Sequence, residues 1–355
     1  MRITYLHPKL DFTDSTARML ASVRVSLGED HEVTVISRKG SRALALRATG
    51  ATFIEGELPT HRLLGIFAAS RTSEQVAELH PDLLHFTDVS LAPLAMKIAD
   101  DLQCPYILEA CRPIEAPLVL SATNSRAVLL PADTFIEKAV NKGNVPRPLL
   151  QVIEHGPDLT SEWQQRLPME SRRPVIIGLG TLDSAHGFDV LIDAAKLLAR
   201  AGRKLDWLVL GEGPDEDQLR RKVRELELCE HFTINSPNLG DIHLALAQAD
   251  LHICSVRSGV PGWSAVRALG MGIPSVFSAI SSTFPLIEDR QEGLLVGPGD
   301  STKLVQSINV LLDNPQAARQ MAVSARNKMH ALKLHETFRR ELIELHNQAM
   351  GLVVN

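Results

Sequence analysis

The chain has 355 residues and a formal net charge of −5 at pH 7, and 45% of its residues are hydrophobic while 22% are charged. This composition is typical of globular proteins, and the acidic balance argues against a protein that binds nucleic acid generally. The length favours two domains of similar size over a single core.

The first half of the chain alternates between short apolar runs and longer amphipathic stretches. The runs that predict strands are residues 2–7, 31–37, 81–87, 105–110 and 127–132. The stretches that predict helices are residues 15–30, 71–80, 91–102 and 135–143. This alternation indicates βαβ units around a parallel sheet. One basic segment, 37–47, has only a sparse apolar face, and we interpret it as solvated surface, with contact to an anionic membrane surface as the alternative.

A polar segment with two prolines, 160–174, interrupts the series and predicts an interdomain linker. A second series follows it. Its predicted strands are 175–180, 205–213, 231–235, 250–256, 274–279 and 293–297. Its predicted helices are 188–202, 215–228, 241–249, 262–272 and 301–314, and residues 315–350 predict one long helical segment. We therefore expect two Rossmann-like, doubly wound α/β domains.

Three glycine-containing turns stand between a strand and a helix in the second half. Residues 178–187 and 258–265 have glycines that let the backbone approach a ligand, and the helix that opens at Trp263 would point its first N–H groups at an anion. The third turn, 211–219, has acidic residues in the first turn of its helix, which favours ordinary capping. The candidate donor or phosphate-binding residues are Gly180, Thr181, His186, Gly259, Gly262, Trp263, Ser264 and Arg267.

Several of these residues also have a purely structural interpretation. The glycines of 178–187 would serve a tight turn, and His186 would be a surface residue of that turn. Trp263 would be a core residue at a plain junction between loop and helix. Arg257 is interpreted as a solvated loop charge.

Polar residues also stand at two strand ends of the first half. His85 and Asp88 follow one strand, and Glu109, Cys111 and Arg112 end another. Doubly wound sheets bind ligands at the carboxyl ends of their strands, so these residues are candidates for ligand contact. For Cys111 the alternative is a small buried filler. The four cysteines include no Cys-x-x-Cys pair, so the sequence indicates no zinc site and favours a reducing cytoplasm.

Taken in order, a set of segments resembles the retaining nucleotide-sugar glycosyltransferases of family four, which have the GT-B fold; the segments are 178–198, 208–223, 231–236, 245–255, 267–278 and 292–300. The resemblance implies an acceptor-side domain at 1–165, a donor-side domain at 166–330 and a C-terminal helix, 331–355, that packs back on the first domain. It also implies a cleft between the domains, faced by His85, Glu109, Cys111 and Arg112. The substrates implied are a nucleotide-sugar and a glycan or lipid acceptor, with no metal expected and no certain cofactor.

The sequence departs from that family where the chemistry is done. Thr181 and His186 stand where the family has an Arg and a Lys that reach the donor diphosphate. Gly259 and Arg267 stand where it has a pair of glutamates, and Cys111 stands where it has a histidine. A guanidinium only donates hydrogen bonds, so Arg267 does not accept them from sugar hydroxyls, although it pairs well with phosphate.

Two functions remain open on these grounds. The first is a glycosyltransferase with altered donor contacts, in which Arg257, Arg267 or Arg112 neutralises phosphate. The second is a catalytically silent GT-B protein that binds a ligand or a partner glycosyltransferase. The two predict different surroundings for Arg267, which are a phosphate in the first case and an internal acid such as Glu288 or Asp300 in the second.

Overall fold

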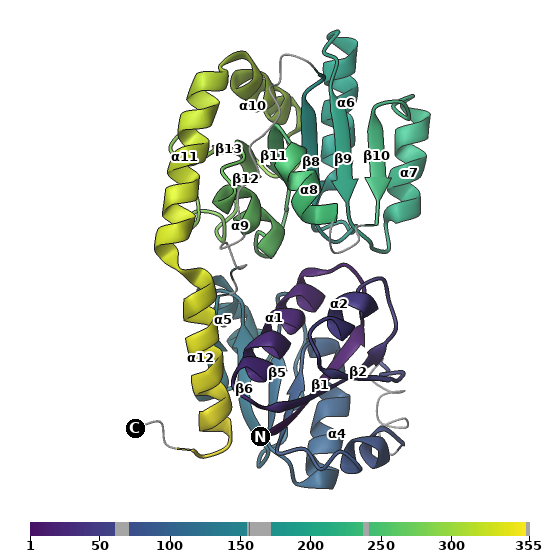
Figure 1. The fold of residues 1–355 in the computed structure, drawn as a ribbon, viewed down its shortest axis with the longest axis vertical. Helices are drawn as coiled ribbons and strands as arrows, with labels where there is room; N and C mark the ends of the chain where they lie inside the picture. The colour runs from purple at the N-terminus through teal and green to yellow at the C-terminus, as the bar shows by residue number, and fades with distance from the viewer. Residues whose placement is uncertain (61–70, 155, 157–171, 237–240, 353–355) are drawn as a thin grey trace. The chain divides into compact units, whose positions relative to one another are not determined.

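The computed structural model describes residues 1–60, 71–154, 156, 172–236 and 241–352, and the chain divides into two compact units (Figure 1). Unit 1 comprises Met1–His155 and Glu336–Asn355, and unit 2 comprises Gly156–His335. The predicted boundary between residues 165 and 166 and most of the predicted linker lie outside the described residues. Each unit is therefore considered by itself.

Unit 1 is built on a parallel sheet with the strand order β3-β2-β1-β4-β5-β6-β7. The strands are β1 (Arg2–Lys9), β2 (Glu32–Arg38), β3 (Thr52–Glu55), β4 (Leu83–Phe86), β5 (Tyr106–Glu109), β6 (Ser125–Leu130) and β7 (Leu150–Val152). Every residue of the central strands β4 and β5 is buried. A parallel sheet is covered on both faces, which is why these strands are continuous apolar runs in the sequence.

The helices of unit 1 include α1 (Asp14–Gly28), α2 (Ala43–Arg47), α4 (Ala92–Leu102), α5 (Ile136–Asn141) and α12 (Leu334–Ala349), and residues 71–77 are also helical. Two of them show recognisable end signals. Thr13 caps α1, because its hydroxyl accepts a hydrogen bond from the backbone N–H of Thr16 at 3.1 Å. Gln103 ends α4 in a left-handed conformation, with a φ of 49°.

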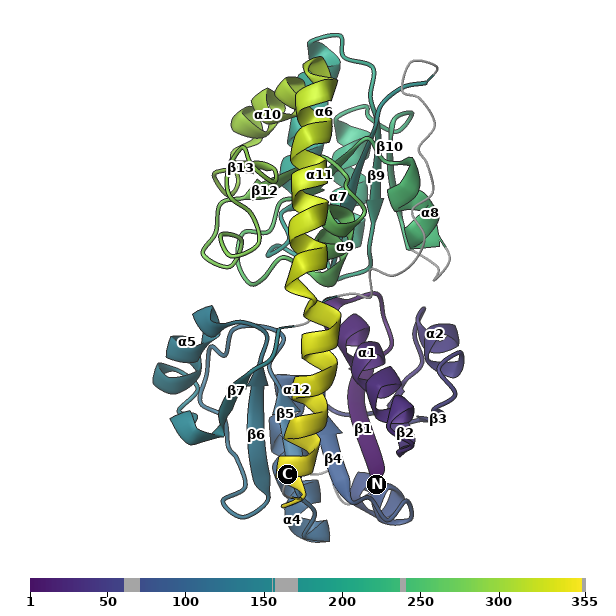
Figure 2. The ribbon, with the colours of Figure 1, turned by 60° about the vertical axis from the view of Figure 1, so that its left-hand side comes forward.

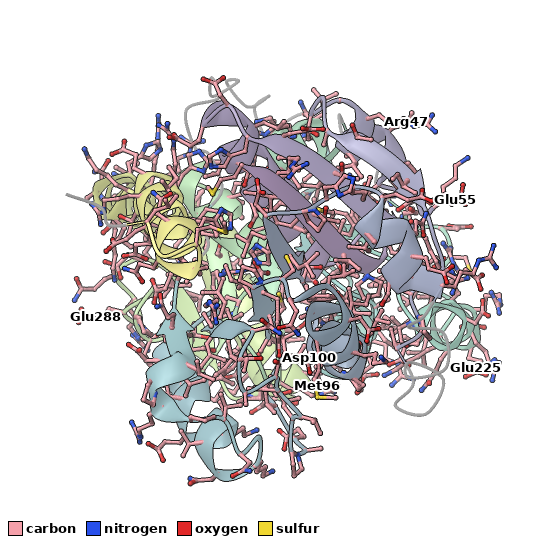
Figure 3. The ribbon with its side chains drawn as sticks, turned by 90° about the horizontal axis from the view of Figure 1, so that it is seen from below. Arg47, Glu55, Met96, Asp100, Glu225 and Glu288 are labelled. Atoms are coloured by element: carbon pink, nitrogen blue, oxygen red, sulfur yellow. The ribbon has the colours of Figure 1, made fainter. Side chains whose placement is uncertain are left out.

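The two faces of the first sheet are covered by different helices. Leu84 packs in the cluster of α4, whereas its neighbour Leu83 packs in the cluster that contains Phe338 of α12. Successive side chains of a strand point to opposite faces, so α4 and α12 must lie on opposite sides of the sheet. Figure 3 shows this arrangement, with α4 marked by Met96 and Asp100.

The C-terminal helix α12 lies along the first sheet, over β4, β5 and β6 (Figure 2). Its Phe338, Leu342 and Leu345 are buried there against a cluster of residues from the strands, which are Leu83, Ile107, Ala127 and Leu129. The sequence predicts one long helical segment over 315–350, and the structure divides it into α11 (Pro315–Leu332) and α12. Lys333 adopts a left-handed conformation with a φ of 47°, which ends the hydrogen-bond ladder of α11 before α12 begins.

Unit 2 repeats the same topology with the strand order β10-β9-β8-β11-β12-β13. The strands are β8 (Val175–Leu179), β9 (Asp206–Leu210), β10 (Phe232–Asn235), β11 (Leu251–Cys254), β12 (Ser275–Ser278) and β13 (Leu294–Val296). The helices are α6 (Phe188–Arg200), α7 (Glu216–Glu225), α8 (Asp241–Gln248), α9 (Trp263–Gly270), α10 (Ser301–Asp313) and α11 (Pro315–Leu332). The predicted pair of doubly wound parallel sheets is confirmed.

The helices of the described residues are all too short or too polar to span a lipid bilayer.

Removing the Phe338 ring tests the packing of α12. Phe338→Ala should lower the free energy of unfolding of unit 1 by about 3–5 kcal/mol, because it deletes a ring that is fully buried. Equilibrium urea unfolding followed by circular dichroism measures the loss. The control is Val323→Ala in α11, where a side chain that is 51% exposed should cost about 0.5 kcal/mol or less. A loss under about 1 kcal/mol for Phe338→Ala would contradict the packing described.

Candidate functional site

In unit 2 the strand order reverses between β8 and β11. The chain proceeds from β8 outward to β10 in one direction, and from β11 outward to β13 in the other. The loops that follow β8 and β11, at residues 180–187 and 255–262, therefore leave the same edge of the sheet side by side. Open α/β sheets bind their ligands outside this reversal, so these loops form the candidate site of unit 2.

The two loops are joined by backbone hydrogen bonds at close range. The amide of Arg257 donates to the carbonyl of Ala185 at 2.7 Å, and the hydroxyl of Ser255 donates to the carbonyl of His186 at 2.8 Å. Gly187 has a φ of 66°, and a Cβ atom there would lie 2.4 Å from the carbonyl oxygen of Ser255. A glycine is therefore required at this position both by conformation and by space.

Arg257 pairs with Asp189 in the first turn of α6. Its Nη1 and Nη2 donate to the two carboxylate oxygens at 2.8 and 2.7 Å, and Nη1 also reaches the carbonyl of Ser184 at 3.1 Å. Burial raises the pKa of Asp189, but the bonds from Arg257 outweigh it and hold that pKa below its usual value. Arg257 is thus a partly exposed loop charge, with 34% of its side chain exposed, that is paired with Asp189 rather than held by solvent alone.

The turn after β8 is organised around Asp183. Its carboxylate accepts hydrogen bonds from the amides of Ala185 and His186 at 3.0 and 3.1 Å, and it lies 2.7 Å from Nδ1 of His186. The His186 ring stacks parallel to Phe188, and a Cβ atom on Gly180 would lie 2.8 Å from it. With only 17% of its side chain exposed, His186 is a packed part of the turn rather than a surface residue.

The helix α9 starts against the end of β8. The buried hydroxyl of Ser264 donates to the carbonyl of Leu179 at 3.4 Å, which places the first turn of α9 next to Gly180 and Thr181. The structure thus brings together Gly180, Thr181, His186, Gly262, Trp263 and Ser264 at one edge of unit 2, with Gly259 in the loop between β11 and α9.

Arg267 lies one turn further along α9 and is held by its neighbours. Its guanidinium stands 5.3 Å over the ring of Trp263, and Nη1 is 3.2 Å from Nε2 of His243 on α8. Burial and the charge of Arg267 lower the pKa of His243, so this ring is neutral. Asp300, one of the acids considered as a partner, instead caps α10 through the amide of Lys303 at 2.8 Å.

Unit 1 has its own reversal, between β1 and β4. His7 fills this point: its Nδ1 is 2.7 Å from the Thr87 hydroxyl and its Nε2 is 2.9 Å from the Thr16 hydroxyl. Burial lowers the pKa of His7 to about 4, against the weaker influence of Asp88. The ring is therefore neutral at pH 7 and serves to join β1, β4 and α1.

A buried ion-pair network lies behind the strand ends of unit 1. The carboxylate of Glu109 is 3.3 Å from Nε of Arg18 and 3.0 Å from Nε2 of His85. His85 and Glu109 have no exposed surface, so they are internal residues and do not line the open edge where the sequence analysis placed them. The buried charges of Arg18 and Glu109 are tolerated because the two side chains are paired with each other.

The other two candidates of unit 1 do reach the surface. Arg112 has 70% of its side chain exposed and lies 3.6 Å from a carboxylate oxygen of Asp88. Cys111 is partly exposed, and its thiol donates toward Glu109 at 3.8 Å. Burial and the charge of Glu109 raise the pKa of Cys111, which keeps it a thiol rather than a nucleophilic thiolate.

Sequence reasoning missed the residues that position these candidates. Asp183, Asp189 and His243 in unit 2 and Arg18 in unit 1 each hold a candidate in place. For Asp189, His243 and Arg18 no local signal exists, because each is brought to its partner by another element of the fold, whereas Asp183 lies three residues before His186 in the same turn. Within the described ranges no cluster of three or more His, Cys, Asp or Glu residues is arranged to hold a metal ion.

Comparison with known families accounts for the geometry of unit 2. Residues 160–328, slightly less than half of the chain, match the model of the family described as "Glycosyl transferases group 1". The matched residues lie within unit 2. The match includes both loops at the reversal and the whole of α9.

Curated proteins that resemble part of this chain are named as glycosyltransferases or as a sugar-phosphate synthase. The chain is 25% identical over 166 residues to alpha-D-kanosaminyltransferase of Streptomyces kanamyceticus, covering 46% of this chain and 43% of that protein. It is 30% identical over 153 residues to mannosylfructose-phosphate synthase of Agrobacterium fabrum, covering 40% and 33%. The chain therefore spans less than half the length of either relative.

Solved structures extend the likeness in fold to the whole chain. Anabaena Alr3699/HepE in complex with UDP-glucose superposes with a TM-score of 0.80 and covers 98% of this chain and 100% of that one, at 17% sequence identity. At this identity the likeness shows the fold alone. The fold is the GT-B-like pair of parallel-sheet domains, of which the group 1 domain is the second.

The junction at Gly187 provides a test of the loop geometry. Gly187→Ala should lower the free energy of unfolding by about 2–5 kcal/mol, because alanine is strained at positive φ and its methyl group meets Ser255. Thermal or urea unfolding measures this loss.

The matched control is Gly202→Ala at the end of α6. Gly202 has a φ of 77°, and no atom lies within 4 Å of the position its Cβ would take. This change should cost only the conformational strain, about 1–2 kcal/mol. Equal losses for the two variants would show that the contact between the loops is loose.

Proposed function

We propose that the protein is a glycosyltransferase of the retaining type that takes a sugar from a nucleotide-sugar donor and passes it to a glycan or lipid acceptor. The observation that carries the proposal is that the group 1 domain match contains the loops 180–187 and 255–262 and the start of α9, which unit 2 gathers at its strand reversal. Proteins that share this domain are named as glycosyltransferases, and HepE was crystallised with UDP-glucose.

In this proposal the donor diphosphate lies against the backbone of Gly180 and Thr181 and the first turn of α9. Backbone N–H groups at a helix start favour negative charge, and glycines permit a close approach. Arg267 supplies the positive charge. Its guanidinium is oriented before a ligand arrives, because Trp263 and the neutral His243 hold it.

The acceptor side of the proposal rests on unit 1. Arg112 and Cys111 are the sequence candidates that reach its surface, and Arg112 is suited to an acceptor with a phosphate or carboxylate group. A lipid acceptor would bring the protein to a membrane surface. The exposed Leu44 of α2 and the neighbouring Arg47 would suit such a contact.

The alternative is a catalytically silent protein that binds a nucleotide-sugar or a partner glycosyltransferase. It is favoured by one observation, which is that Asp189 already neutralises Arg257. Arg257 then does not replace the Arg and Lys that related sequences use for the diphosphate. Both functions place the protein in the cytoplasm, consistent with four free cysteines.

Donor binding tests whether the protein has a nucleotide-sugar site at all, which both functions require. In a panel of UDP-, GDP- and ADP-sugars, one donor at about 100 times its Kd should add about 2.7 kcal/mol of stability. Differential scanning fluorimetry detects this as a rise in Tm. No rise with any member of the panel would contradict both the transferase and the nucleotide-binding alternative.

Replacing Arg267 tests the role assigned to it. Arg267→Ala should weaken binding of the donor by about 1.5–3 kcal/mol, the range for a hydrogen bond to a charged group, with unfolding stability changed by less. Isothermal titration measures the first quantity and a melting curve the second. The control is Arg221→Ala, an exposed arginine of α7, which should change neither.

Two results would count against this role. Unchanged donor affinity with lowered stability would make Arg267 a structural partner of Trp263 and His243. Retained affinity together with no transfer to any acceptor would favour the silent protein.

A further inference from the structure

A chain of buried side chains connects the C-terminal helix α12 to the middle of the first sheet. Nε2 of His346 on α12 lies 3.3 Å from Nδ1 of His85 on β4. Nε2 of His85 lies 3.0 Å from the carboxylate of Glu109 on β5. All three side chains are buried, and the two imidazole rings meet edge to face with 5.5 Å between their centroids.

These contacts determine which groups face His346. The Glu109 carboxylate lies 3.0 Å from Nε2 of His85, and the other ring nitrogen of His85 faces Nε2 of His346. Arg18, at 3.3 Å from Glu109, already balances the carboxylate, so a second positive charge on His346 would have no equivalent partner in this chain of contacts.

We propose that His346 and His85 form a proton-sensitive latch, which holds the last turns of α12 on unit 1 while His346 is neutral and releases them when it takes up a proton. The latch is distinct from the proposed donor site in unit 2 and does not depend on the proposed function.

The direction of the pH dependence follows from the surroundings of His346. Burial, and then the neighbouring His85 and His31, lower its pKa well below the ordinary value. A released helix would expose the ring to water and return its pKa to about 6.5. Acid therefore favours release: the latch is at full strength well above pH 6.5, is about twofold weaker at pH 6.5, and approaches a tenfold weakening per pH unit at lower pH.

Other contacts of α12 decide how far the release extends. Phe338 and Leu342 keep its first half on the apolar cluster, and Phe338 also lies under the guanidinium of Arg18. The last turns are held by Leu345 and Ala349 in the same cluster, by His346, and by Arg126, whose Nε donates to the carbonyl of Ala349 at 3.2 Å. Residues 343–350 are the segment on which a charge on His346 would act.

The titratable and charged groups that face α12 come from every element around it: Tyr5, Arg18, Glu29, His31, His85, Glu109, Arg126 and Glu154. Glu154 acts with the opposite sign, because burial and nearby acids raise its pKa and acid then stabilises the folded state. His7 acts with the same sign as His346 but lies outside the interface. A variant of His346 alone is needed to separate these contributions.

Hydrogen–deuterium exchange with mass spectrometry on the full chain tests the latch. Rates are measured between pH 7.5 and pH 5.5 and corrected for the intrinsic pH dependence of exchange. In the wild-type protein the corrected rate for residues 343–350 should rise about fivefold between pH 6.5 and 5.5, while peptides of α6 in unit 2 stay unchanged. In His346→Gln, whose amide retains a donor without titrating, the rise should be less than about threefold.

The control His80→Asn replaces an exposed histidine of unit 1 and should keep the wild-type pH dependence. Equal rises in the wild type and in His346→Gln would overturn the proposal. If His346→Gln does not fold, the wild type alone decides: unchanged protection of residues 343–350 down to pH 5.5, or a loss shared by α6, would also overturn it.

Discussion

The carboxylate of Glu109 imposes the main electrostatic constraint on unit 1. A buried carboxylate is costly unless charged or polar partners surround it, and here they come from three other elements: Arg18 from α1, His85 from β4 and, through His85, His346 from α12. Satisfying one side chain on β5 therefore fixes the positions of the helices on that face of the sheet. Cys111, which is partly exposed, and Arg112, which is exposed, follow Glu109 in the chain, so this buried network also positions them.

In unit 2 a charged pair likewise holds separate segments together, here two loops at the surface. The bidentate pair of Arg257 and Asp189, with the contact of Gly187 on Ser255, joins the two loops that leave the reversal of the sheet. The loops are thus rigid before any ligand binds, which reduces the entropy that binding would otherwise cost. The same pairing occupies the guanidinium of Arg257, so in the proposed function the charge for a phosphate comes from Arg267.

The sequence predicts the fold well because its strands are apolar runs and its helices have regular amphipathic spacing. It misses α2 and β3, which are short enough that their local signal is weak, and the break at Lys333, where a residue with no turn preference is left-handed. For the candidate site, glycines at strand ends indicate where two backbone segments lie in close contact. The partners of charged residues are not predictable in this way: Arg257 and Asp189 are 68 positions apart, and His85 and His346 are 261 apart.

The order of elements along the chain has a consequence for biosynthesis. Unit 1 is completed by α12, which the ribosome makes only after the whole of unit 2. Until then the nascent first unit exposes the apolar strip of Leu83, Ile107 and Leu129, and its Arg18 and Glu109 stay close to water. Domains of growing chains usually fold in order from the N-terminus. In this chain the N-terminal unit cannot be completed in that order, because its last helix is synthesised after the whole of unit 2.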